Sequence, residues 1–259
     1  MSDEYQFGIL LDSARRGNAA ETDAIAKMCM SHPYYLISTL SENEADIQPL
    51  MCETFRTMFL NLDVITQRVG LQNWVDTLAV RKCIEGLRGR HSDLFTPLID
   101  AESDSDLTLQ DLEDERAPFN PVKYASVLPS INEGEKLVEK IISPLDFDQR
   151  IMLVLFYMQD LTLLEIAGDF KSKWKRVRAR LIPVRDAIYS ALPDVPASAR
   201  VAMFTWLVHK EQDSAEVPAD IVEAVLAASR AAAKEYASID HAPKSKKISF
   251  LDLFRKKKD

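Results

Sequence analysis

The most distinctive chemistry in this sequence is a run of basic side chains between residues 171 and 185, with no acidic residue until Asp186. Cationic side chains on one helix neutralise phosphates and release counterions, which gives affinity for nucleic acid without sequence preference. The run therefore predicts a phosphate-binding helix, and the alternative interpretation is a solvated basic helix face. Its members are Lys171, Lys173, Lys175, Arg176, Arg178, Arg180 and Arg185.

The elements before this run predict how it is positioned. An apolar helical pattern covers residues 151–157, a short helix surrounds Glu165, and a turn near Asp169 leads into the basic helix. A short helix, a turn and a basic second helix form the layout of a helix-turn-helix, whose second helix lies in the DNA major groove. Base contacts would come from the first turns of that helix, which include Ser172 and Trp174. Inside the same helix, Pro183 predicts a kink.

Composition favours an all-α protein with segregated charge. The chain has 259 residues but only 7 glycines, and it lacks the β-branched alternation of a sheet protein. Its net charge is −8, with 32 basic and 40 acidic residues, which does not suit a DNA-binding protein unless the basic residues are clustered. They are clustered, because the basic helix lies in a chain that is acidic elsewhere.

No motif in the sequence predicts catalysis, a cofactor or a metal site. The three cysteines, Cys29, Cys52 and Cys83, are far apart and are typical of buried thiols in a reducing compartment. The four histidines are scattered, and no Gly-rich phosphate loop is present. No apolar run reaches the length of a membrane span, and the acidic N-terminus is unlike a signal peptide. We therefore expect a cytoplasmic protein without stable membrane insertion that is not an enzyme.

Changes in composition divide the chain into five parts. They are a helical module at 5–92, an acidic flexible linker at 93–132, a helix-turn-helix module at 133–191, a helical extension at 192–240 and a basic tail at 241–259. Pro33 and Gly70 mark helix breaks inside the first module. The two helices of the extension are expected to pack on the helix-turn-helix module. The linker either serves as a solvated tether or folds back and masks the basic helix.

The second module resembles region four of bacterial sigma factors of the extracytoplasmic-function type. That family has an "EIA" motif, a turn, and then a valine followed by basic residues and a leucine. The matching residues here are Glu165-Ile166-Ala167, Val177, Arg178, Arg180, Leu181 and Arg185, with Leu145, Gln149-Arg150 and Phe156-Tyr157 upstream. The resemblance implies that the helix from about Ser172 binds the minus-thirty-five promoter element.

The first module resembles region two of the same family. The matching residues are Arg16-Gly17-Asn18, Asp46, Glu53-Thr54-Phe55, Trp74-Val75, Leu78-Ala79, Ile84, Leu87 and Arg88. The resemblance implies that the helix from Asp46 grips core RNA polymerase, with Asp46, Gln48, Glu53 and Phe55 as contacts. For Phe55 the alternative is ordinary packing in the core. It also implies capture of the melted minus-ten element by residues 60–74 and the next helix. Arg81 and Arg88 on that helix are candidates for phosphate contacts.

These patterns together predict a two-module, all-α transcription initiation factor. Its expected partners are core RNA polymerase and promoter DNA, and the resemblance allows an anti-sigma regulator as a third. One alternative is a sigma-like interaction protein that binds polymerase or a regulator without selecting promoters. Another is a helix-turn-helix repressor, which is expected to dimerise.

Overall fold

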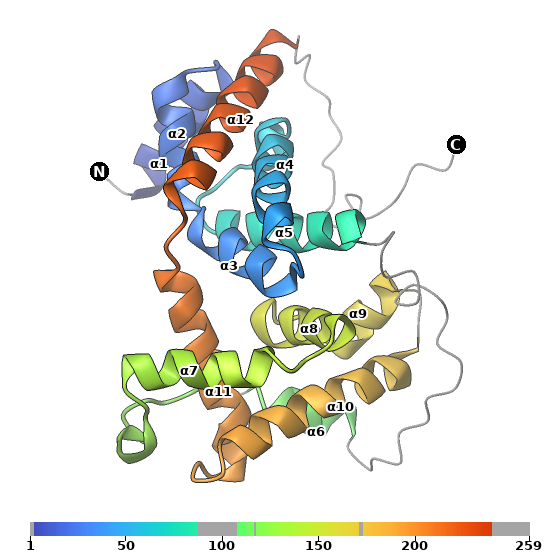
Figure 1. Cartoon of the computed structure of the whole chain (residues 1–259). Helices are drawn as coiled ribbons and strands as arrows, with labels where there is room; N and C mark the ends of the chain where they lie inside the picture. Colours follow the sequence, from blue (N-terminus) through green and yellow to red (C-terminus); the bar gives the residue numbers. More distant parts are fainter. Residues whose placement is uncertain (1–2, 88–107, 117, 171–172, 240–259) are drawn as a thin grey trace. The chain divides into compact units, whose positions relative to one another are not determined.

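The structure is a computed structural model that describes residues 3–87, 108–116, 118–170 and 173–239. Every regular element in these residues is helical: twelve α-helices, three short 3₁₀ turns and one π-helical turn (Figure 1). The prediction of an all-α fold is therefore confirmed. Within the same described ranges, no helix is long and apolar enough to cross a membrane.

The chain folds into two compact units. Unit 1 is formed by described residues within 1–34, 43–82 and 216–259, and unit 2 by those within 35–42 and 83–215. Two helices, α3 (Ser31–Leu40) and α5 (Leu71–Leu87), begin in unit 1 and end in unit 2. Unit 1 thus joins the first part of the chain to its last described helix, a long-range association that the predicted modules did not contain.

In unit 1 a tight turn connects α1 (Asp3–Arg15) to α2 (Ala19–Met28). Gly17 has a φ of 78°, a left-handed conformation that favours glycine. The next residue, Asn18, caps α2, because its side-chain oxygen accepts a hydrogen bond from the Ala20 N–H at 3.1 Å. A Cβ atom at position 17 would lie 3.4 Å from the Ala237 side chain, so the turn also packs closely against the last helix.

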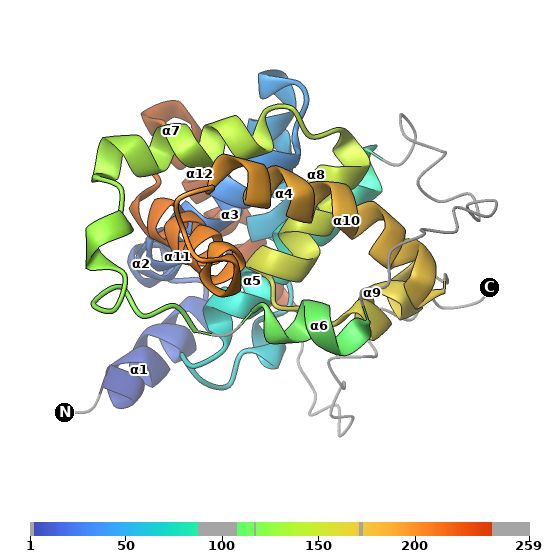
Figure 2. The same cartoon turned by 90° about the horizontal axis from the view of Figure 1, so that it is seen from below.

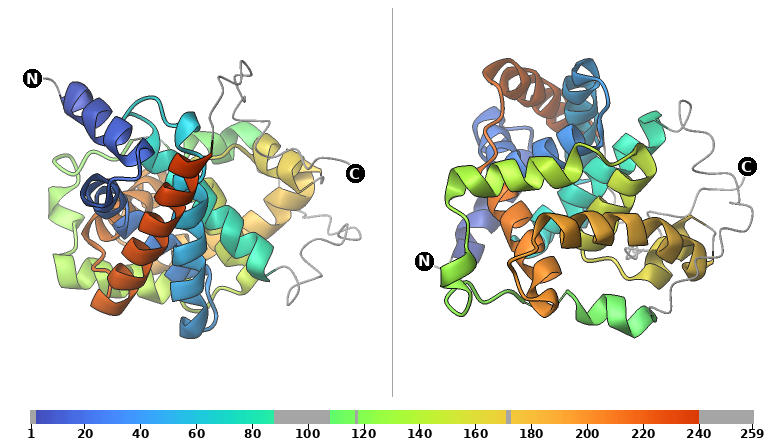
Figure 3. Two further views of the ribbon diagram at one scale, coloured as in Figure 1. Left: turned by 90° about the horizontal axis from the view of Figure 1, so that it is seen from above. Right: turned by 60° about the horizontal axis from the view of Figure 1, so that its bottom comes forward.

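That last helix, α12 (Ala219–Ser238), packs against α4 (Ile47–Phe59), α2 and α1 of unit 1 (Figure 3, left). Small buried residues, Ser229, Ala232 and Ala233, allow the close approach. The expectation that both C-terminal helices pack on the second module is therefore wrong for α12. An apolar stripe shows that a helix is buried, but its periodicity does not say which neighbour buries it.

Polar contacts hold α12 in place along its length. The Arg230 guanidinium donates hydrogen bonds of 2.7 and 2.5 Å to both carboxylate oxygens of Asp23 on α2. On α4, Arg56 pairs with Glu235 at 3.3 Å. The Tyr236 hydroxyl donates a hydrogen bond to Asp63, in the turn after α4. These contacts fix the rotation of α12 about its own axis, in addition to its apolar burial.

The two predicted helix breaks in the first module have different outcomes. Gly70 has a φ of 87° and directly precedes α5, so that break is confirmed. Pro33 lies inside α3, which already begins at Ser31. A proline in the first turn of a helix costs little, because its missing N–H would have no partner within the helix there. The predicted break is therefore present, but it lies at residues 29 and 30 and not at Pro33.

Unit 2 is built around the long helix α10 (Trp174–Ala191), which α7, α8, α9 and α11 contact (Figure 2). The apolar pattern at 151–157 forms α8 and then the π-helical turn η5, and the aromatic side chains of Phe156 and Tyr157 are fully buried there. The surrounding elements are α7 (Ile131–Ile142), α8 (Phe147–Leu153), η5 (Val154–Met158), α9 (Leu163–Asp169) and α11 (Ala197–Ser214). For α11 the expected packing on the second module is observed.

Part of the predicted linker also belongs to unit 2. Residues 109–114 form α6 (Leu109–Asp114), which lies below α10 in Figure 3, right. Leu112 is fully buried, and Arg116 donates hydrogen bonds of 3.1 and 3.2 Å to the backbone carbonyls of Phe156 and Leu161. The prediction of a flexible linker is therefore wrong for residues 108–116, because they have their own buried contacts. Residues 93–107 lie outside the described residues.

Candidate nucleic-acid interface

Reciprocal hydrogen bonds fix the start of the short helix α9. The Thr162 hydroxyl accepts a hydrogen bond from the Glu165 N–H at 3.2 Å, and the Glu165 carboxylate accepts one from the Thr162 N–H at 2.9 Å. The hydrogen bonds from the Thr162 backbone and hydroxyl lower the pKa of the Glu165 carboxyl. Leu163 is fully buried, whereas the next residue, Leu164, is 59% exposed. α9 is thus held by one face and presents an apolar side chain on the other.

Residues 170–173 connect α9 to α10, and α10 is anchored by one apolar stripe. The stripe follows the spacing of a single helix face. It consists of Val177, Leu181, Val184 and Ile188, all buried. The helix continues through Pro183, which is exposed, so the proline does not end the element. The basic residues of α10 are therefore distributed around the remaining faces of one continuous helix.

The first turns of α10 carry their positive charge at the surface. Lys173 and Lys175 are exposed, and Arg176 is partly exposed. The guanidinium of Arg178 lies 5.3 Å from the centroid of the Trp174 ring, within the range of a cation–π interaction. The start of the helix therefore presents an indole ring surrounded by cationic groups.

Further along the helix, the basic side chains are held by carboxylates of unit 2. Arg180 pairs with Asp148 of α8 at 2.7 Å, and the Arg180 side chain is only 17% exposed. Arg185 pairs with Glu115, which follows α6, and both of these side chains are 16% exposed. Neither guanidinium is therefore presented to solvent in the way that Lys173 and Lys175 are.

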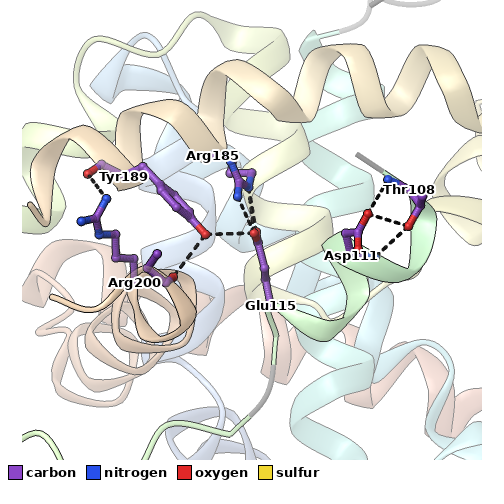
Figure 4. A network of polar contacts seen from close by, with 7 residues as sticks. Thr108, Asp111, Glu115, Arg185, Tyr189 and Arg200 are labelled. Carbon is purple, nitrogen blue, oxygen red and sulfur yellow. Dashed lines mark hydrogen bonds and ion pairs between the residues drawn. The ribbon is translucent and has the colours of Figure 1, made fainter. Parts of the chain in front are cut away.

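The Glu115 carboxylate is the centre of a network of polar contacts (Figure 4). It accepts three hydrogen bonds of 2.6 to 2.9 Å from Arg185 and one of 2.9 Å from the Tyr189 hydroxyl. The Arg185 guanidinium also lies 3.9 Å from the centroid of the Tyr189 ring, and Arg200 donates a hydrogen bond of 3.3 Å to the Tyr189 carbonyl. The hydrogen bonds from Arg185 to Glu115 raise the pKa of the Arg185 guanidinium. The pKa of the Tyr189 hydroxyl is also raised, first by burial and then by its hydrogen bond to the Glu115 carboxylate.

A groove lies where the end of α9 meets the start of α10. Its volume is about 550 Å³, and it is lined by Leu164, Ala167, Gly168, Lys173, Trp174 and Lys175. The apolar part comes from Leu164, Ala167 and Trp174, and the two lysines add positive charge. An apolar surface with cationic neighbours suits a ligand that carries both apolar and anionic groups.

The structure separates the residues that were predicted to bind DNA. It brings Lys173, Trp174 and Lys175 together at the groove, with Arg176 and Arg178 in the next turn. Arg180 lies on α10 but pairs with Asp148. The partly buried Arg81 is on α5, in unit 1, and therefore does not belong to this site. The remaining predictions, Lys171, Ser172 and Arg88, lie outside the described residues.

The four residues predicted to contact polymerase lie on or just before α4 of unit 1. Gln48 and Glu53 are exposed, and Glu53 pairs with Lys82 of α5 at 3.2 Å. Asp46 is partly buried in the turn before the helix. Phe55 is fully buried. Phe55 is therefore a core residue in this structure, and a partner could reach its side chain only if unit 1 opened.

Three residues of unit 2 have contacts that the sequence did not assign to them individually, although the alternative in which the acidic linker folds back on the basic helix agrees with the Glu115–Arg185 pair. Glu115 and Arg116 end the acidic stretch, and no local pattern shows that their partners lie some 40 to 70 residues further on. Leu164 did leave a signal, because two adjacent leucines in a short helix cannot both face the core. The exposed leucine of the groove was thus predictable, but the ion pair was not.

The thiols show no feature of a reactive site. Cys29 and Cys83 are buried, and desolvation raises the pKa of each thiol to about 12. Burial also raises the pKa of Cys52, which is partly exposed. A thiolate is the nucleophilic form of cysteine, so burial disfavours the reactive form of these thiols. Among the described residues, no group of three or more His, Cys, Asp or Glu side chains is arranged to hold a metal ion.

Comparisons with known proteins found no match to this chain. No protein-family model matches the chain, and no curated protein or solved structure does so either. The resemblance to sigma factors therefore rests on the sequence motifs alone, and the function has to be argued from the geometry of the chain itself.

Proposed function

We propose that this protein is a sigma-like transcription initiation factor, which binds core RNA polymerase and directs it to promoter DNA. The observation that carries the proposal is the start of α10. There Lys173, Lys175 and Arg176 lie at or near the surface around Trp174, directly after a short helix and a connection of four residues. This order of elements is that of a helix-turn-helix, in which the start of the second helix contacts the base edges.

The internal ion pairs of unit 2 support a contact limited to the first turns of α10. Because Arg180 and Arg185 are engaged by Asp148 and Glu115, they add little to a phosphate-binding surface. In a helix-turn-helix the N-terminal residues of the recognition helix contact the base edges, so a contact limited to the first turns of α10 fits this role. The other helices of unit 2 then serve to hold α9 and α10 at a fixed angle.

For the polymerase contact, we propose the exposed side of α4. Gln48 and Glu53 lie there, and Glu53 presents its carboxylate together with the ammonium group of Lys82. Because Phe55 is buried, it would act by holding α4 in place and not by touching the partner. Arg81 on α5 remains our candidate for a phosphate contact in unit 1.

One observation favours a second candidate function. α12 packs along α4, the helix proposed to bind polymerase, and covers one side of α4. A chain with this arrangement would suit an interaction protein that binds polymerase or a regulator in another way, without selecting promoters. The two candidates differ in whether the protein produces discrete transcription starts.

Run-off transcription tests the proposal. The full chain is added to sigma-free bacterial core polymerase on sheared genomic DNA of its own host. We expect discrete start sites that disappear when Lys173, Lys175 and Arg176 are all replaced by alanine, while binding to core polymerase persists. Core binding without discrete starts would favour the interaction protein. Absence of core binding would contradict both candidates and leave a helix-turn-helix repressor.

A further inference from the structure

The groove between α9 and α10 has an unusual lining for a surface at the end of a basic helix. Leu164 leaves 59% of its surface exposed, and Trp174 is only partly buried, although both side chains are large and apolar. Contiguous exposed apolar surface is costly in water and commonly marks a binding site. The two side chains come from different helices and line one groove, so a ligand would touch both at once.

The polar groups of the groove restrict the chemistry of this ligand. Among the described residues that line the groove, none carries a carboxylate, an amide or a hydroxyl, and the charged ones are Lys173 and Lys175. Such a surface offers apolar contact through Leu164, Ala167 and Trp174 and attracts anions through its two lysines. In the major groove of DNA, the C5-methyl group of thymine is the apolar feature of the base edges, and phosphates flank it on both sides.

We infer that Leu164 and Trp174 form an apolar seat for the methyl group of a thymine, and that they set a preference for an A·T base pair in the bound sequence. This inference rests on the proposed function, because it assigns the base chemistry read at the same site. Lys173 and Lys175 contact the adjacent phosphates and contribute affinity without sequence information. The Arg178 guanidinium, 5.3 Å from the Trp174 ring centroid, holds the indole ring in position from outside the groove lining.

The inference predicts a chemical signature that is independent of the other base contacts. Deoxyuridine differs from thymidine only in the C5-methyl group, so it keeps the base pair, the hydrogen-bonding groups and the phosphates. Burying one methyl group against an apolar surface corresponds to about a three- to fivefold change in affinity. The sensitive positions are expected at one or two adjacent base pairs, because Leu164 and Trp174 line a single groove.

The experiment starts with selection of duplexes from a random-sequence pool by the full-length protein. In the best-bound duplex, each thymidine is then replaced by deoxyuridine in turn, and the dissociation constants are measured at one salt concentration. We expect one or two replacements to weaken binding three- to fivefold and the others to have no effect. If no replacement weakens binding by more than twofold, the inference is overturned and DNA binding stands. If no duplex is selected at all, the DNA-binding part of the proposed function fails as well.

Three variants connect the methyl effect to the groove. In Leu164→Ala and Trp174→Phe, we expect the thymidine duplex to bind as weakly as the deoxyuridine duplex, so that the replacement no longer matters. Lys175→Ala, the matched control, should weaken both duplexes equally. Because Leu164 is largely exposed, Leu164→Ala should keep the circular dichroism spectrum and melting temperature of the native chain. A methyl effect that persists unchanged in both Leu164→Ala and Trp174→Phe would overturn the inference.

Discussion

The first turns of α10 and its middle turns both carry basic residues and use them in opposite ways. At the start, Lys173 and Lys175 place their ammonium groups at the surface, next to Trp174. In the middle turns, Arg180 and Arg185 are largely buried and form ion pairs. The difference arises outside the helix, because Asp148 and Glu115 come from other parts of unit 2. A basic run in a sequence is therefore not the same as a basic surface.

The largest effect is expected from removing one of the partly buried ion pairs of α10. Glu115→Ala removes the partner of Arg185 and of the Tyr189 hydroxyl and leaves a guanidinium that is only 16% exposed without its carboxylate. We expect the free energy of unfolding to fall by about 2–4 kcal/mol, measured by urea denaturation.

Asp186→Ala is the control for this variant, because Asp186 is exposed on the same helix. It should change the stability by less than about 0.5 kcal/mol. DNA affinity should change by less than about twofold in Glu115→Ala, since Arg185 lies far from the first turns of α10. An increase in affinity of more than about fivefold would instead show that Glu115 masks a binding cation.

The next largest effect is expected from removing the cationic side chains at the start of α10. Replacing Lys173, Lys175 and Arg176 together by alanine should lower DNA affinity by about 10- to 100-fold near 0.1 M salt. The slope of log K against log salt should fall by about two to three, because about three phosphate contacts are lost. The matched control is Lys136→Ala with Lys140→Ala, two exposed lysines of α7. Unchanged affinity and slope in the triple variant would rule out this end of α10 as the DNA-binding surface.

A carboxylate that accepts a hydrogen bond from a hydroxyl group extends the comparison with Asp148 and Glu115. Glu211 of α11 accepts a hydrogen bond of 2.8 Å from the Tyr35 hydroxyl, and its acidic neighbours are Glu135 and Glu139 of α7. Burial raises the pKa of the Glu211 carboxyl from 4.5 to about 7, the hydrogen bond from Tyr35 opposes the shift, and the two acidic neighbours add to it. Between these two pH values the folded state binds more protons than the unfolded state, so stability should fall as pH rises from 4.5 to 7.

After allowance for solvent screening, this loss amounts to about 1–2 kcal/mol. Urea denaturation at several pH values measures it, and the loss should level off above pH 7 because both states are then ionised. Glu211→Gln should remove this part of the pH dependence, since glutamine does not titrate. A pH profile that is the same in Glu211→Gln and in the native chain would contradict the prediction.

The smallest effect comes from two arginines that are one helical turn apart. Arg176→Ala should weaken DNA binding about three- to tenfold and leave stability unchanged. Arg180→Ala should lower stability by about 0.5–1 kcal/mol, through loss of the pair with Asp148, and change DNA affinity by less than about twofold. Equal losses of DNA affinity in the two variants would show that Arg180 leaves Asp148 to contact DNA.

Most helices were predictable because their signals are local. The positions of α4, α5 and α11 follow apolar periodicity, and Gly70 marks the start of α5 by its positive φ. The error at Pro33 has the same local origin, since a proline suits the first turn of a helix as well as a break. Local rules fix where helices form, with some ambiguity at their ends.

The candidate site was predictable in part. Sequence patterns identified the basic residues of α10 and the short helix before it, because clustered charge and a turn between two helices are properties of neighbouring residues. They did not predict that Arg180 is paired, and they left open whether Phe55 contacts a partner or packs in the core, where it is fully buried. Both outcomes depend on neighbours from other elements, and periodicity alone does not name those neighbours.

The sequence by itself determined the all-α class, the course of most helices and the concentration of positive charge on one of them. Only the tertiary structure decided which of these charges reach the surface, and that α12 packs on unit 1 while α11 packs on unit 2. The physical reason is that these interactions connect residues at different distances along the sequence. Helix propensity and amphipathic periodicity act over a few residues, whereas burial and ion pairing depend on residues such as Glu115 and Arg185, which are 70 positions apart in the sequence.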